Sequence, residues 1–428
     1  MERSPDSSLY DLITKELERA HSVSSSSESV LRVPKELREG NEQDYTPKTI
    51  SIGPLHAGKS NLRLKEEIKI RYLHCFNSHM KPGKTLEDLI LVIRQLEQRI
   101  RNWYVEPISL ASDDFVKMML TDGCFIAELM WRYKNIDRVD TGDPIYNMRK
   151  PRLAMLYNLQ RDLLLLENQI PFFVLEHLYE FRKNNECHSL VHLTLSFFRN
   201  IMPMEGELHS PTFETSPKHL LDLVMHALFP HPTRIAGIEP MMPQALYQDI
   251  ISAAELELYG VKFKRGKSTS LADIQFHNGV LEIPPIVVQE STVSLFRNLL
   301  ALEQCSDEYT GLFTSYAIFM DCLINGEKDV ELLLRNGIMQ TWVNDVQELV
   351  TLFNRLSVDV VANLEDFHFR RLFHDVNLYC SRPWNQQRAY LVRNYYDVRW
   401  DLLNSVFLFI LTFTQTLFSV LSYYPRNN

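Results

Sequence analysis

Apolar side chains recur every three or four positions through most of this chain of 428 residues. The spacing is clear at 62–76, 86–104 and 113–133, and it returns at 188–200 and from about 293 to 396. Such spacing puts the apolar residues on one face of an α-helix, where they can pack against a core. Strand patterns do not alternate with these segments, which argues against a parallel α/β sheet. The sequence therefore predicts a mainly α fold, a large helical domain in two halves.

One short segment carries the signal of a β-hairpin. The runs LADIQF and VLEIP lie on either side of Asn278 and Gly279. Asparagine followed by glycine tolerates the positive φ angles of a tight hairpin turn. We expect one small hairpin at about 271–283.

Composition divides the remainder of the chain. Residues 1–30 end in a serine run and predict a flexible N-terminal segment. The helical domain is expected at 31–400. A stretch rich in proline and histidine, from about 202 to 243, predicts a loop between halves at about 45–200 and 244–400.

The C-terminal stretch 402–424 contains no charged residue. As a helix it would reach roughly 34 Å, enough to cross a hydrocarbon core of about 30 Å. Trp400 precedes it and Tyr423 and Tyr424 close it, as interfacial aromatic residues do. The stretch predicts a single transmembrane helix and hence contact with a membrane bilayer. The alternative is a buried helix of a soluble scaffold, because hydroxyls and Gln415 make the stretch only moderately apolar.

Charges beside that stretch predict its orientation. Arg388, Arg393 and Arg399 precede it, and only Arg426 follows it. The positive-inside rule then keeps the large domain in the cytosol. The N-terminus has no apolar signal-peptide region, so the expected layout is a tail-anchored, single-pass membrane protein. Plasma membrane and endomembrane are both compatible with the sequence.

A stripe of small polar residues follows one face of the expected membrane helix. It consists of Ser405, Thr412, Thr416 and Ser419. Stripes of this kind let membrane helices approach closely and form hydrogen bonds. The stripe predicts self-association or pairing with another membrane helix, and scattered, tolerated hydroxyls are the equally weighted alternative.

Composition and motifs exclude several classes of function. The formal net charge of −9 argues against nucleic acid as a partner, since such binding depends on cationic residues. The short basic run at 262–267 is explained by a solvated loop. His188 and His192 have the i, i+4 spacing of two metal ligands, but no third ligand stands nearby. No motif of a catalytic or cofactor site stands out, so we expect no enzyme, no cofactor and no metal.

The sequence GPLHAGKS at 53–60 fits the phosphate-binding P-loop pattern at every specified position. A nucleotide site would use Gly53, Gly58, Lys59 and Ser60, with TISI as the preceding strand. Two observations weaken this interpretation. P-loop domains are parallel α/β folds, and Pro54 removes one backbone N–H from the loop that would hold phosphate. Nucleotide binding therefore stands as the alternative function.

Six blocks of sequence resemble the plant family DUF247, also called UPF0481. They begin with RVPKELREGNEQDYTPKTISIGPLHAGKSNLRLKEEIKIRYL and MLTDGCFIAELMW, and continue with RDLLLLENQIPFFVLEHL and GVKFKRGKSTSLADIQFHNGVLEIPPI. The last two are STVSLFRNLLALEQC and TFTQTLFSVLSYY. The family pattern S-I-G-P-x-H-x-G is carried here by Ser51, Ile52, Gly53, Pro54, His56 and Gly58.

The resemblance implies a mainly helical domain with a C-terminal membrane span, no known enzymatic activity and no cofactor. Some grass members of the family are implicated as pollen-side determinants of self-incompatibility. We therefore expect a non-enzymatic, membrane-anchored plant protein that acts through protein–protein recognition, with self-incompatibility as its most concrete form. Within the motif, we expect Gly53 and Gly58 to permit a structural turn, His56 to fix it or titrate, and a helix to begin near Asn61.

Overall fold

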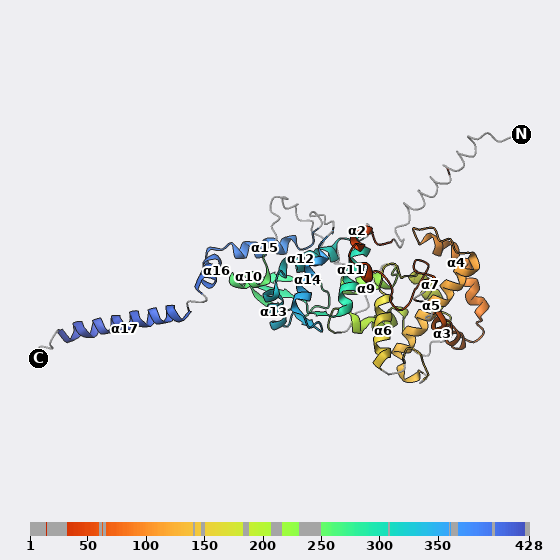
Figure 1. Ribbon diagram of the computed structural model, residues 1–428, viewed down its shortest axis with the longest axis horizontal. Helices are drawn as coiled ribbons and strands as arrows, with labels where there is room; N and C mark the ends of the chain where they lie inside the picture. Colours follow the sequence, from red (N-terminus) through yellow and green to blue (C-terminus); the bar gives the residue numbers. More distant parts are fainter. Residues whose placement is uncertain are drawn as a thin grey trace.

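The protein is mainly helical and elongated (Figure 1). The computed structural model describes residue 14 and residues 32–59, 62, 66–139, 142–146, 150–182, 188–206, 216–230, 250–306, 309–358, 360, 367–395 and 399–423. The predicted flexible segment at 1–30, apart from residue 14, lies outside these residues, as do 207–215 and 231–243 of the loop predicted at 202–243.

Helix α5 (Ser112–Lys134) is the centre of the N-terminal part. Every residue from Met119 to Met130 of α5 is buried, so this helix is surrounded on all sides rather than amphipathic. Its neighbours are α3 (Glu66–Ser78), α4 (Leu86–Asn102), α7 (Phe172–Tyr179) and α8 (Leu190–Phe198). The periodic segments of the sequence thus form helices at nearly their predicted bounds and pack around one buried helix.

Helix α11 (Glu290–Gln304) packs against helices that lie both before and after it in the chain. It contacts α6 (Lys150–Asp162) and α9 (Leu220–Leu228) on one side and α12 (Leu312–Leu323) and α14 (Val346–Leu356) on the other. The remaining helices are α2 (Lys35–Arg38), α10 (Ala253–Leu258), α13 (Glu327–Arg335), α15 (Arg370–Cys380), α16 (Pro383–Tyr395) and α17 (Arg399–Tyr423), with 3-10 turns η1 (Glu42–Asp44), η3 (Ile136–Arg138) and η4 (Arg199–Ile201). The division into halves stays a prediction.

The strands form two small sheets. In the first, β2 (Gln275–His277) and β3 (Val280–Ile283) pair antiparallel, and β1 (Lys262–Arg265) pairs parallel with β3. Asn278 and Gly279 have φ angles of 50° and 80°, so the predicted hairpin is present with the predicted turn. In the second sheet, β4 (Ile286–Val288) pairs parallel with β5 (Met339–Thr341). The sequence did not predict β1, β4 or β5, because three or four residues give little periodic signal.

Helix α17 corrects the membrane prediction. Among the residues that the structure describes, no helix combines the length and apolar character needed to cross a membrane. The transmembrane helix predicted at 402–424, and with it the single-pass, tail-anchored topology, is therefore wrong. The physical reason is the polar content of the stretch, in which Asn404, Gln415 and several hydroxyls interrupt the apolar residues.

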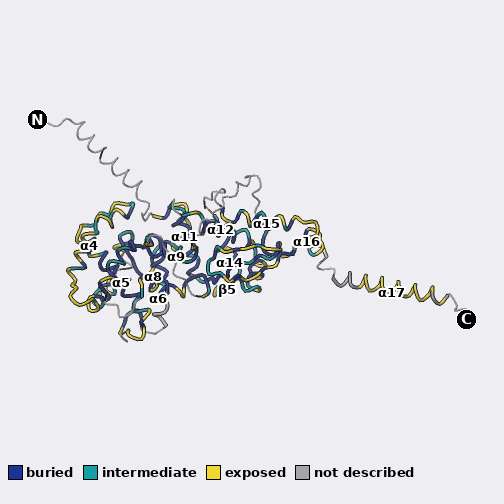
Figure 2. The backbone as a smooth tube through the Cα atoms, turned by 180° about the vertical axis from the view of Figure 1, so that it is seen from behind, coloured by how far each residue is buried: buried dark blue, intermediate teal, exposed yellow. Residues whose placement is uncertain are grey.

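The alternative of a buried C-terminal helix is also wrong. Residues 404–420 are all exposed, and α17 projects away from the body (Figures 1 and 2). The hydroxyls of Thr412, Thr416 and Ser419 each donate to the carbonyl oxygen four residues earlier in α17, at 2.6 to 2.8 Å. These hydroxyls of the predicted stripe are therefore already hydrogen-bonded within their own helix. Self-association stays a prediction.

Candidate functional site at the Gly53 turn

The segment before the Gly53 turn is held by side chains instead of by a neighbouring strand. Asp162, at the end of α6, accepts from the backbone N–H groups of Lys48 at 3.0 Å, Thr49 at 2.5 Å and Ile50 at 3.0 Å. Asn168 accepts from Ile52 N at 2.7 Å and donates to Ile50 O at 3.1 Å. These two side chains satisfy the backbone groups of a segment that belongs to no sheet.

Gly53 occupies a position that only glycine fits. Its φ angle is +70°, and its N–H donates to Asp122 Oδ2 at 2.8 Å. A Cβ atom at this position would lie 2.7 Å from the carbonyl oxygen of Gln169. Gly58 has a φ angle of +79°, but a Cβ atom there would meet nothing within 4 Å. Gly53 is therefore required by both conformation and space, and Gly58 by conformation alone.

A buried ion pair lies directly beneath the turn. Lys69 on α3 lies 2.7 Å from Asp122 Oδ1 on α5 and 2.7 Å from Glu66 Oε1. Burial by itself would lower the pKa of Lys69, but Asp122 and Glu66 outweigh that effect and raise it. The lysine is therefore charged, and Asp122 links it to the backbone of Gly53.

The histidine of the motif points inward. His56 is 3% exposed, and its Nε2 atom lies 3.3 Å from Glu167 Oε2. Glu167 also accepts from Val33 N at 2.9 Å and from the Arg38 guanidinium. Burial opposes the charge of this carboxylate, but His56, Arg38 and the Val33 N–H outweigh it and lower the pKa of Glu167 to about 2. Glu167 thus ties three points of the N-terminal segment to the turn after α6.

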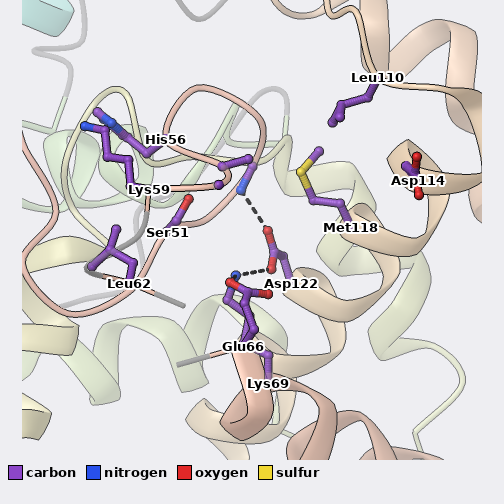
Figure 3. A pocket seen from close by; sticks show the side chains of 13 residues that line it. Ser51, His56, Lys59, Leu62, Glu66, Lys69, Leu110, Asp114, Met118 and Asp122 are labelled. Atoms are coloured by element: carbon purple, nitrogen blue, oxygen red, sulfur yellow. Dashed lines mark hydrogen bonds and ion pairs between the residues drawn. The ribbon is translucent and has the colours of Figure 1, made fainter. Parts of the chain in front are cut away.

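A cavity of about 220 Å³ lies between this turn and the start of α5. His56 and Lys59 line it from the turn, whereas Asp114 and Met118 line it from α5 (Figure 3). Lys59 is exposed, and its pKa is lowered chiefly by partial burial, with the nearby Arg38 and Arg32 adding to the effect. The cavity wall therefore carries charges of both signs.

The loop geometry does not support the nucleotide hypothesis. The N–H groups of Ile52, Gly53 and Ala57 are bonded to Asn168, Asp122 and the Pro54 carbonyl, respectively. Asp122 thus accepts from the first glycine of the pattern, and a carboxylate there would repel a nearby phosphate. No strand precedes the loop, and the helix predicted from near Asn61 is present as α3, which begins at Glu66. Ser60 lies outside the described residues.

The other candidate ligands do not form a site either. The His188 and His192 rings are stacked, with centroids 5.2 Å apart. Within the described ranges, no group of histidine, cysteine, aspartate or glutamate residues could hold a metal ion. The cysteines at 75, 124, 305, 322 and 380 are free thiols, and Cys187 lies outside the described residues.

Sequence reasoning missed the residues that hold the Gly53 turn. Asp162, Glu167 and Asn168 are buried and act on the backbone of the N-terminal segment. The block RDLLLLENQIP could have indicated these residues, because polar side chains stand on both sides of a run of four leucines. An acid and an amide placed within a buried stretch need hydrogen-bond partners, which a distant backbone supplies here.

The fold and this turn define a mainly helical protein whose N-terminal segment is locked to its core by buried polar side chains. A family model described as a plant protein of unknown function, DUF247, matches residues 30–414. The UPF0481 protein At3g47200 of Arabidopsis thaliana is 31% identical over 92% of this chain and 86% of its own length. The putative UPF0481 protein At3g02645 of the same plant is 23% identical over 90% of this chain and 88% of its own length.

The chain therefore belongs to the DUF247 (UPF0481) family, as the six sequence blocks predicted. No solved structure matches it.

Proposed function

We propose that this protein acts through non-enzymatic protein–protein recognition, and that the exposed face of α16 is its contact surface. The observation that carries the proposal is the exposure of large side chains on this helix. Trp384 is 77% exposed, Tyr390 is 63% exposed and Leu391 is 55% exposed. Exposed aromatic residues gathered on one helix face are typical of binding surfaces.

Helical geometry brings these residues together. At about 100° per residue, Trp384, Tyr390 and Leu391 fall within one side of α16, while Asn385 and Ala389, both buried, face the body. Pro383, Gln386, Gln387, Tyr390 and Leu391 line a shallow groove of about 450 Å³ along this side. The groove and the aromatic side chains together offer a surface for one side of a partner protein.

Charge indicates the chemistry of that partner. From Ser381 to Asn394 the chain has three arginines and no acidic residue, although the whole chain carries a net charge of −9. Arg393 lies 3.2 Å from Glu255, and Arg382 lies over the Tyr379 ring. We therefore propose a partner that presents acidic residues around an apolar centre, because such a surface complements arginines around aromatic anchors.

The test compares partner capture by wild type and by a double variant, Trp384→Ala with Tyr390→Ala. Trp342→Ala is the matched control, since Trp342 is 80% exposed but lies on a different element, after β5. We expect the partner to bind purified wild type and Trp342→Ala with equal affinity. It should bind the double variant at least tenfold more weakly. Equal binding by all three proteins, or loss in the control alone, would reject α16 as the contact surface.

A pollen-side role in self-incompatibility is the narrowest form of this proposal. It requires expression in pollen and allele-dependent rejection in crosses. Absence of both would reject this form while leaving recognition through α16 to be tested by binding.

A further inference from the structure

A second cavity, of about 250 Å³, lies where the N-terminal segment meets the C-terminal part of the body. Its walls come from the segment 37–45, from α11 and from the end of α14. None of its lining residues belongs to the cavity at the Gly53 turn.

Tyr45 lines this cavity. The residue is 2% exposed and lines the cavity, and its hydroxyl forms no hydrogen bond with any residue that the structure describes. Burial raises the pKa of Tyr45 to about 12, so the hydroxyl keeps its proton at neutral pH. A tyrosine hydroxyl can donate one hydrogen bond, so an acceptor placed beside Tyr45 in the cavity would find an available donor.

Two arginines line the same cavity. Arg355, at the end of α14, is exposed and has no ion-pair or hydrogen-bond partner in the described part of the chain. Arg297 on α11 has its Nε atom 3.3 Å from Asp44 Oδ2, yet that buried atom makes no hydrogen bond. Glu39 is the one acidic lining residue, and it is exposed. Asp44 offsets the charge of Arg297. The Arg355 guanidinium is therefore the lining group most available to bind an anion.

Four aliphatic side chains line the rest of the wall together with Gly40 and the polar Asn41. Leu300 and Leu356 are buried, Leu37 is partly buried, and Val358 is 55% exposed. Pockets for drug-sized ligands run from roughly 300 to 1,000 Å³, so a cavity of about 250 Å³ suits a smaller molecule. The wall therefore combines aliphatic side chains with hydrogen-bond donors.

We propose that this cavity binds a small carboxylic acid with an apolar body. The carboxylate accepts hydrogen bonds from the Arg355 guanidinium and from the Tyr45 hydroxyl, and Arg297 adds to the positive potential. A guanidinium presents parallel N–H groups that match the two oxygens of a carboxylate. The apolar body packs against Leu300 and Leu356. Because the walls come from segments far apart in sequence, the bound acid also stabilises the docking of segment 37–45 on α11 and α14.

The test uses the full chain and three simple probes: phenylacetate, 3-phenylpropionate and 4-phenylbutyrate. Titration calorimetry and ligand-observed NMR measure binding. We expect saturable binding of at least one probe, with a dissociation constant on the order of 1 mM or tighter, which is typical of ligands this small. The matching neutral amide and plain acetate each lack one half of the proposed chemistry, and both should bind at least about tenfold more weakly.

Variants assign the binding to this cavity. Arg355→Gln and Tyr45→Phe should each weaken binding by about tenfold, because each removes one donor and keeps much of the side-chain volume. Arg371→Gln, which removes an exposed arginine from α15, should change nothing. No saturable binding by any of the three acids, equal binding of the amide, or unchanged affinity in Arg355→Gln would overturn the proposal. None of these outcomes bears on recognition through α16.

Discussion

The turn after α6 and the helix α16 use their side chains in opposite ways. Residues 162–169 bury an aspartate, a glutamate, an asparagine and a glutamine, and the structure bonds all four to backbone or to other buried groups. Helix α16 buries an alanine and an asparagine and exposes a tryptophan, a tyrosine and a leucine. Each region breaks the usual rule that polar groups face water and apolar groups face the core.

The buried polar groups at 162–169 and the exposed apolar groups of α16 therefore have different roles. A buried polar group that forms hydrogen bonds holds the fold together, and its removal leaves its partners buried without a hydrogen bond. An exposed apolar group contributes little to the fold and remains available to a partner. Substitutions in the first region should therefore change stability, and substitutions in α16 should change binding.

Asp162→Ala should have the largest effect. It leaves the buried N–H groups of Thr49 and Ile50 without an acceptor, so we expect a loss of about 4 kcal/mol in the free energy of unfolding. Denaturant titration followed by circular dichroism measures it. Asp273→Ala is the control, because Asp273 is exposed and should cost less than about 0.5 kcal/mol. Equal losses in the two variants would contradict the assigned role of Asp162.

Glu167→Gln should show a loss that depends on pH. The folded-state pKa of Glu167 falls from 4.5 to about 2, so its charged form stabilises the fold by about 3 kcal/mol above pH 4.5. This contribution decreases as the pH falls from 4.5 toward 2, since the folded-state pKa is the lower one. The stability difference between wild type and variant should therefore be full at pH 7 and shrink below pH 4.5.

The control for Glu167 is Glu106→Gln. Glu106 pairs with Arg32 at 2.6 Å, but both side chains are about half exposed, at 46% and 49%. Exposed pairs contribute less than about 1 kcal/mol. A loss for Glu167→Gln that does not vary with pH would show that packing, and not charge, explains it.

Gly53→Ala and Gly58→Ala form a matched pair within the motif. Alanine at 53 would meet the Gln169 carbonyl at 2.7 Å and also take a positive φ, so we expect a loss of about 2–3 kcal/mol. Alanine at 58 meets only the φ penalty, about 1 kcal/mol. Thermal unfolding of both variants checks the order. The reverse order would contradict the close approach at Gly53.

Trp384→Ala with Tyr390→Ala should have the smallest effect on stability, less than about 0.5 kcal/mol, because both side chains are mostly exposed. The same double variant is expected to lose partner binding. Thermal unfolding measured beside the binding assay separates the two. A large stability loss would show that Trp384 and Tyr390 stabilise the fold, as the buried residues of the turn after α6 do.

Long periodic segments explain how much of the fold was predictable. The helices around α5 are predictable because three- and four-residue spacing of apolar residues persists over several turns. The hairpin is predictable because Asn278 and Gly279 favour the positive φ angles of its turn. The P-loop pattern could not be resolved in the same way. A pattern of letters does not show that Asp122 already occupies the donor at Gly53, since Asp122 is 69 residues away.

The membrane prediction failed for a related reason. The lack of charge over 402–424 favours a membrane span, but the amides and hydroxyls of the stretch lower its apolar character without adding charge. The exposed face of α16 was missed because exposure depends on what other segments cover, and no local pattern records that.

The sequence alone determined the family, the helical class, the hairpin and the glycine-rich turn, because each depends on local spacing or on blocks of letters. Only the tertiary structure decided that Asp162, Glu167 and Asn168 hold the N-terminal segment and that Trp384 and Tyr390 face outward. It also decided that Tyr45, Arg297 and Arg355 meet in one cavity. The hydrogen bonds and the cavity join residues more than 50 positions apart, and exposure depends on which segments cover a helix. Both are set by the packing of the chain, which local periodicity does not encode.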